Sequence, residues 1–181
     1  MIWRCNDKYN KKLYCNTPHV SEEQIKEAFT HTWGEILAHK GQYIAKYEAD
    51  ITRLADTTIL EKKRLEIMAK CAETSSLIQE CIAQNAASPK NQVEYQKQYD
   101  KLVGQYNDAK AQLDAIDMKK LENSARREKL HRFVEVLQKA ESPPVTFNEK
   151  LWRETIDHIS VYTLDNVVAH FNSGDEIRVS M

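Results

Sequence analysis

Cysteines are the first side chains of this sequence whose type and spacing suggest chemistry. Cys5 and Cys15 lie in two segments that read as short strands, with nine residues and a basic turn between them. A zinc ribbon holds its metal with two cysteine pairs, because a tetrahedral Zn²⁺ site needs four ligands. One pair is present here, so the pattern indicates either half of a zinc site or two unrelated thiols. His19 is a candidate third ligand because of its spacing from Cys15.

The same segment carries a basic patch. Arg4, Lys8, Lys11 and Lys12 are opposed by Asp7 alone within the first 20 residues. Such a patch can contact the phosphates of nucleic acid. A solvated turn would carry the same charges, so both interpretations stay open.

A second basic run extends from residue 119 to residue 132, with six basic and two acidic side chains. It is either a solvated helix face or a phosphate contact. The six histidines show no HxxH or HExxH spacing, and the sequence shows no nucleophile constellation or phosphate-binding loop. The chain is therefore not expected to be an enzyme by itself.

Composition narrows the fold. The 181 residues include only four glycines and four prolines, which excludes collagen-like, linker-like and turn-rich all-β folds. No apolar run approaches the roughly 20 residues that cross a bilayer, and the start shows no signal region. We expect a cytosolic protein of almost neutral charge (-1) whose cysteines are thiols or metal ligands.

Helix signals begin after the head. Ser21 and Gln24 form a capping box, in which each side chain bonds a backbone N–H at the start of a helix. Apolar residues then recur at helical spacing to about His39, and a break is possible near Gly41.

Two long proline-free stretches follow, at about 42–86 and 92–141, with a turn at about 85–91. In the first, a seam of small residues includes Cys71 and Cys81, which we expect to be buried. The second has six consecutive matches to a 3.5-residue repeat, which is typical of a coiled coil. Its seam residues are Tyr95, Tyr99, Leu102, Tyr106, Ala109, Leu113 and Ile116. The tyrosines read as packing residues, with a base-stacking row as the alternative.

The fold class that follows is mainly α: a long antiparallel coiled-coil hairpin projecting from a small α+β body. The body would hold a partial zinc-ribbon hairpin and a C-terminal β element. Expected boundaries are 1–41 for the ribbon and first helix, 42–142 for the hairpin, and 143–181 for a returning helix and strands. In that last part Pro143 and Pro144 end the long helix, residues 147–159 form a short one, and strands follow at 160–163, 167–171 and 176–179.

Several of these segments together resemble the C-terminal region of the large serine recombinases, which include phage integrases and transposon resolvase-like enzymes. The head is similar to the second half of that family's zinc β-ribbon, and the seam is similar to the returning arm of its coiled-coil motif. The matching residues are 2–5 (IWRC), 14–15 (YC) and 17–22 (TPHVSE) in the head, 95–110 in the seam, and 147–162 and 171–177 in the terminal element.

The resemblance implies a site-specific recombination module that docks on double-stranded DNA and joins recombinase subunits. It implies DNA contact through the basic head, zinc on Cys5 and Cys15 in a longer parent, and association at the coiled-coil tip near Lys90, Val93 and Glu94. The family's first cysteine pair and its catalytic serine domain are not in this sequence. We therefore expect a piece of a longer bacterial, cytoplasmic, DNA-bound protein that holds little zinc alone and does not cut DNA.

A structural coiled-coil adaptor, with no role on nucleic acid, is the alternative.

Overall fold

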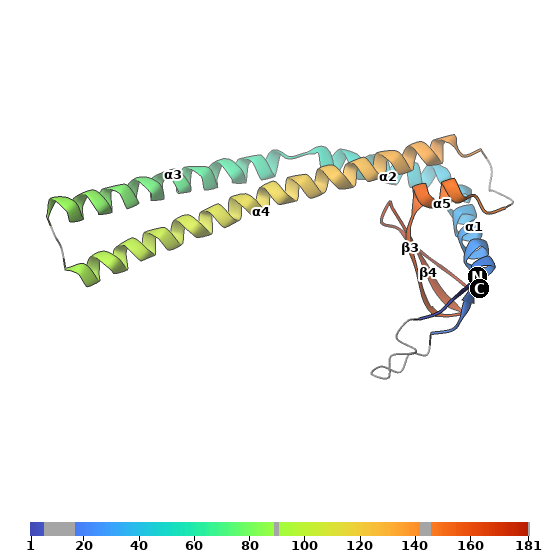
Figure 1. The fold of residues 1–181 in the computed structure, drawn as a ribbon. Helices are drawn as coiled ribbons and strands as arrows, with labels where there is room; N and C mark the ends of the chain where they lie inside the picture. Colours follow the sequence, from blue (N-terminus) through green and yellow to red (C-terminus); the bar gives the residue numbers. More distant parts are fainter. Residues whose placement is uncertain (6–16, 89–90, 142–145, 181) are drawn as a thin grey trace. The chain divides into compact units, whose positions relative to one another are not determined.

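The computed structural model describes residues 1–5, 17–88, 91–141 and 146–180 (Figure 1). Cys15, Lys8, Lys11, Lys12 and Lys90 lie outside the described residues. The fold is mainly helical, as predicted, and it has two compact units. The hairpin unit is Leu54–Arg126; the terminal unit combines Met1–Arg53 with Arg127–Met181.

The hairpin unit consists of α3 (Thr58–Ala87) and the first part of α4 (Gln92–Lys139), which run side by side (Figure 1). Ile67 of α3 packs with Ala109 and Ile116 of α4 in its buried core. Arg64 bonds Asp117 at 3.0 Å, and Glu61 pairs with Lys120. Because partner numbers fall on α4 as they rise on α3, the helices are antiparallel, which confirms the predicted coiled-coil pairing.

The terminal unit contains all the strands. A two-stranded sheet pairs β1 (Ile2–Trp3) with β2 (Val20–Ser21), and helices α1 (Glu22–Ala38) and α2 (Lys40–Ala55) follow. After the last turns of α4 come α5 (Glu149–Thr155) and an antiparallel sheet in the order β3-β4-β5. Those strands are Ile156–Thr163, Asn166–Phe171 and Glu176–Val179.

Aromatic side chains form the core of the terminal unit. The ring of Phe133 on α4 lies 5.9 Å from Trp33 on α1, 5.5 Å from Tyr47 on α2 and 6.1 Å from Phe171 on β4. All four side chains are buried. Edge-to-face aromatic contacts at these distances stabilise a core beyond the area that they remove from water. Phe133 therefore ties the end of α4 to two helices and the sheet.

The ends of the helices follow their local sequence. The predicted capping box is present: the Gln24 N–H donates to Ser21 Oγ at 3.2 Å, and the Ser21 N–H donates to Gln24 Oε1 at 2.9 Å. At the other end of the unit, the Lys40 ammonium donates to the carbonyls of Gln138 and Ala140. A cation at that place satisfies carbonyls that the last turn of α4 leaves unpaired.

Three expectations about element boundaries differ from the structure. The short helix ends at Thr155, so Ile156 and Ile159 belong to β3, where β-branched residues pack well. The first helix ends at His39, as expected, but a further break that was not expected falls at residues 56–57. The division into units comes at residues 53/54 and 126/127 instead of 41 and 142, because Tyr47 and Phe133 pack together in the terminal unit.

Candidate functional site

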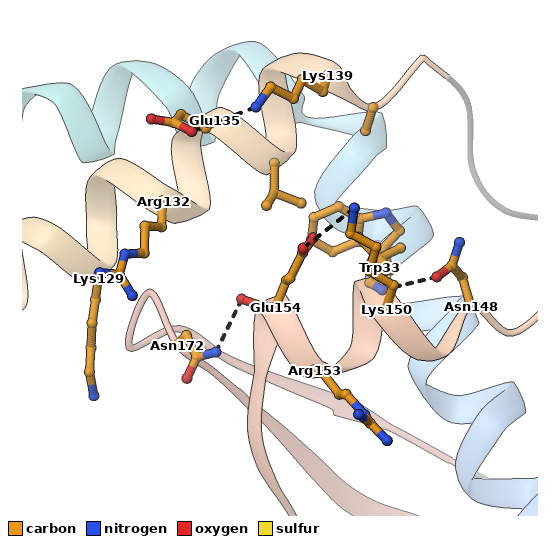
Figure 2. A pocket seen from close by; sticks show the side chains of 13 residues that line it. Trp33, Lys129, Arg132, Glu135, Lys139, Asn148, Lys150, Arg153, Glu154 and Asn172 are labelled. Carbon is orange, nitrogen blue, oxygen red and sulfur yellow. Dashed lines mark hydrogen bonds and ion pairs between the residues drawn. The ribbon is translucent and has the colours of Figure 1, made fainter.

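A basic cleft lies in the terminal unit (Figure 2). It has a volume of about 880 Å³ and lies between the last turns of α4 and helix α5. Seven charged side chains line it, of which five are cations and two are glutamates: Lys129, Arg132, Lys139, Lys150 and Arg153, with Glu135 and Glu154.

Helical spacing explains why the cations gather here. Lys129 and Arg132 are three residues apart on α4, and Lys150 and Arg153 are three residues apart on α5, so each pair shares one helix face. Asn148 begins α5 as its N-cap, since its side-chain oxygen accepts the Leu151 N–H at 3.0 Å. The cap and the packing of Phe147 and Trp152 against Phe29 therefore fix the helix that presents two of the five cations.

The ion pairs of the cleft are local and exposed. Arg132 pairs with Glu128, Lys139 with Glu135, and Lys150 with Glu154, each within one helix at four-residue spacing. Such exposed pairs contribute only about 0.3–0.5 kcal/mol each, so an incoming anion can displace them. Lys129 forms no ion pair with any residue that the structure describes. The cleft can therefore supply several cations to one polyanionic ligand.

Hydrogen bonds tie the turn after β4 to the end of α5 in this cleft. Asn172, at the end of β4, donates through its side-chain amide to the carbonyl of Glu154 at 3.2 Å (Figure 2). Its backbone N–H donates to the carbonyl of Thr155 at 2.8 Å. The buried Trp33 and the half-buried Leu151 contribute apolar surface. The chemistry of this surface is anion binding over a partly apolar floor; it presents no pairing of nucleophile and base.

A second polar cluster in the terminal unit holds a turn in place. The buried Tyr47 hydroxyl donates to Asp175 at 2.5 Å and lies 3.2 Å from the Ser173 hydroxyl, and Lys46 forms an ion pair with Asp175. Burial raises the pKa of Asp175, but hydrogen bonds from Lys46, Tyr47 and Ser173 lower it further, so the net shift is downward. Burial and the Asp175 hydrogen bond raise the pKa of Tyr47. This cluster fastens the turn after β4 to α2.

The head residues that suggested chemistry are only partly described. Arg4 is exposed next to β1, and Cys5 is a half-buried free thiol. No group of three or more His, Cys, Asp or Glu residues placed to hold a metal occurs in the described part of the chain. With Cys15, the sequence supplies two of the four thiolates that a ribbon site needs, so no chemical step is assigned to zinc here.

The predicted association residues lie at the start of α4. Val93 is 76% exposed, and Glu94 is exposed beside it. The seam residues face α3 to different degrees: Ile116 is buried, and Tyr95, Tyr99, Leu102, Tyr106 and Leu113 are half-buried. The rings of Tyr95 and Tyr99 stack at 6.0 Å. The seam is therefore occupied by pairing within one chain, and Val93 remains uncovered.

Sequence reasoning found part of the basic cleft. It singled out Lys129 and Arg132 in the second basic run but missed Lys139, Lys150 and Arg153. The available signal was the repeated three-residue spacing of cations on both sides of Pro143 and Pro144. Nothing in the sequence showed that the two helices would form opposite sides of one cleft.

The chain matches no family model, no curated protein and no solved structure. In the described part of the chain, no helix combines the length and apolar character that crossing a membrane requires.

Proposed function

We propose that this chain is the DNA-docking and subunit-association module of a site-specific serine recombinase, which integrates or excises a mobile element. The basic cleft is the observation that carries the proposal, because five cations from two helices converge on it. Duplex DNA presents about one negative charge per 1.7 Å of its axis, and lysine and arginine are its usual phosphate ligands. Arg4, Lys8, Lys11 and Lys12 of the head supply a further contact in this proposal.

The hairpin supports the second half of the proposal. Its seam is closed within one chain, so association between chains must use another surface. Val93 offers an exposed apolar side chain beside Glu94, and Lys90 precedes it by three residues in the sequence. Small contacts of this kind are reversible, which suits subunits that must join and separate. In a longer protein that contains this chain, Cys5 and Cys15 would share zinc with a second cysteine pair.

The DNA-docking part is tested with a fluorescently labelled duplex and the full chain. The variant Lys129→Glu/Arg132→Glu should bind at least tenfold more weakly, because each charge-assisted hydrogen bond to a phosphate contributes about 1.5–3 kcal/mol. Lys62→Glu/Lys70→Glu on α3 makes the same change in net charge outside the cleft and is the matched control. A variant with alanine at Arg4, Lys8, Lys11 and Lys12 measures how much the head contributes to duplex binding.

Equal weakening by the α3 control would mean that overall charge, not the cleft, governs binding. A parent chain that binds no duplex at low salt would contradict DNA docking and favour the structural adaptor.

Association at the tip is tested by sedimentation. Val93→Asp should reduce weak self-association without loss of helix, because it places a charge in an apolar contact. Met118→Asp is the control, since Met118 is also an exposed apolar residue of α4 (57%) but lies far along the helix. If both variants associate as the parent does, the tip is not the contact surface.

A further inference from the structure

Helix α3 has a second apolar face that its partner helix does not cover. Leu65, Met68, Ala72, Ser75, Gln79 and Ile82 follow one another at alternating steps of three and four residues. Positions 69, 76 and 83 beside them are also uncharged. Leu65, Met68 and Ile82 are 64%, 43% and 45% exposed, although each is large and apolar. We call this surface the uncharged face of α3.

This face is distinct from the α3–α4 seam. The seam uses Leu60, Ile67 and Cys71, which pack on Ala109, Leu113 and Ile116 of α4. Steps of three and four residues are the pattern by which a helix meets another helix. A helix that shows this pattern on two faces can contact two neighbours, and in the described hairpin unit α3 has only one, α4.

The two rims of the uncharged face differ in charge. On the side away from α4, Glu66, Glu73 and Glu80 recur every seven residues, and all are exposed. On the α4 side, the Arg64–Asp117 ion pair identifies the neighbouring helix face. Asp114 and Asp100 are spaced from Asp117 along that face, with the cation Lys110 between them. Arg64 adds a second cation at this rim, where it also donates to the Met68 sulfur at 3.2 Å, so the rim beside α4 carries mixed charges.

These charges disfavour a second copy of the chain as the occupant. An antiparallel pair of α3 helices would bring one row of glutamates against the other. A parallel pair would bring the glutamates against the rim of mixed charge beside α4, where Arg64 is already paired with Asp117. Like charges at the flanks of a helix pair oppose association, whereas opposite charges select a partner.

We propose that the uncharged face of α3 docks an amphipathic partner helix that carries an apolar stripe with lysine or arginine on the flank that meets the glutamates. Leu65, Met68 and Ile82 would contact the stripe, and Glu66, Glu73 and Glu80 would pair with the basic flank. The small residues between them allow the partner helix to approach closely. This docking is independent of DNA binding, since all of these residues lie in the hairpin unit.

The experiment uses the full chain and two labelled synthetic peptides of three heptads. Both have leucine at the two core positions of each heptad; one has lysine and the other glutamate at the flanking positions. The lysine peptide should bind, and the glutamate peptide should bind at least tenfold more weakly. Met68→Gln/Ile82→Gln should weaken binding of the lysine peptide at least tenfold. Glu73→Gln/Glu80→Gln should weaken binding of the lysine peptide severalfold. It should also reduce the difference in affinity between the lysine and glutamate peptides.

Ile59→Gln/Leu77→Gln is the matched control. Both residues are exposed apolar residues of α3, at 81% and 43%, but they lie on a different face of the helix. This variant should bind within twofold of the parent, and circular dichroism should show equal helix in all variants.

Equal binding of the two peptides, or an equal effect of the control, would overturn the proposal. So would a dimer of the parent chain that Met68→Gln/Ile82→Gln abolishes, because a second copy would then occupy the face.

Discussion

The buried hydroxyl of Tyr47 and the carboxylate of Asp175 make a testable contribution to stability. The pKa of Asp175 is lowered below its ordinary value of 3.8, mainly because hydrogen bonds to the ionised form outweigh its burial. A depressed pKa means stability that is present above the ordinary pKa and lost as pH falls through the folded one. The free energy of unfolding should therefore fall below about pH 4, and Asp175→Asn should lose that part of the acid dependence.

Tyr47 affects the free energy of unfolding at alkaline pH. Its pKa is raised above the ordinary value of 10.0 by burial and by Asp175. A raised pKa means stability that is present below the ordinary pKa and lost as pH rises above it. Tyr47→Phe should remove this alkaline loss and cost about 1–2 kcal/mol at neutral pH, because Asp175 and Ser173 lose a buried partner. Urea unfolding across the pH range measures both effects, and an unchanged alkaline limb would contradict this assignment.

At the scale of elements, the long helix α4 contains one glycine whose replacement should change the stability of the chain. Gly104 is exposed in the middle of the helix, and a Cβ placed there would meet no atom within 4 Å. Gly104→Ala should therefore stabilise the chain by about 0.5–1 kcal/mol, since alanine loses less backbone freedom in a helix and makes no clash here. Thermal unfolding by circular dichroism measures it. A lower unfolding temperature would contradict this expectation.

Some features of these elements could be predicted from the sequence, and others could not. The seam from Tyr95 to Ile116 and the Ser21–Gln24 capping box were predictable because each depends on spacing within one helix. The end of α5 at Thr155 was not, because Ile156 fits either a helix face or a strand. The cleft and the Tyr47–Asp175 bond escaped prediction because each joins residues far apart in the sequence.

At the scale of the whole molecule, a formal charge of -1 conceals two surfaces of opposite sign. The terminal unit has a cleft lined by five cations and two acids, and the hairpin unit has an uncharged face with one acidic rim. A polyanion and a basic helix would therefore bind at different places. Substitutions in one surface should leave binding at the other unchanged, because the two surfaces share no residue and sites with no shared partners are usually additive.

The salt dependence of duplex binding is the most direct test of whether the cations of the cleft contact DNA phosphates. Each phosphate contact contributes about -0.9 to the slope of log K against log salt concentration. If Lys129 and Arg132 each contact a phosphate, Lys129→Glu/Arg132→Glu should make that slope shallower by about 2 relative to the parent. The Lys62→Glu/Lys70→Glu control should keep the parent slope. If Lys129→Glu/Arg132→Glu keeps the salt slope of the unmutated chain, the cations of the cleft touch no phosphate and the proposed DNA docking is wrong.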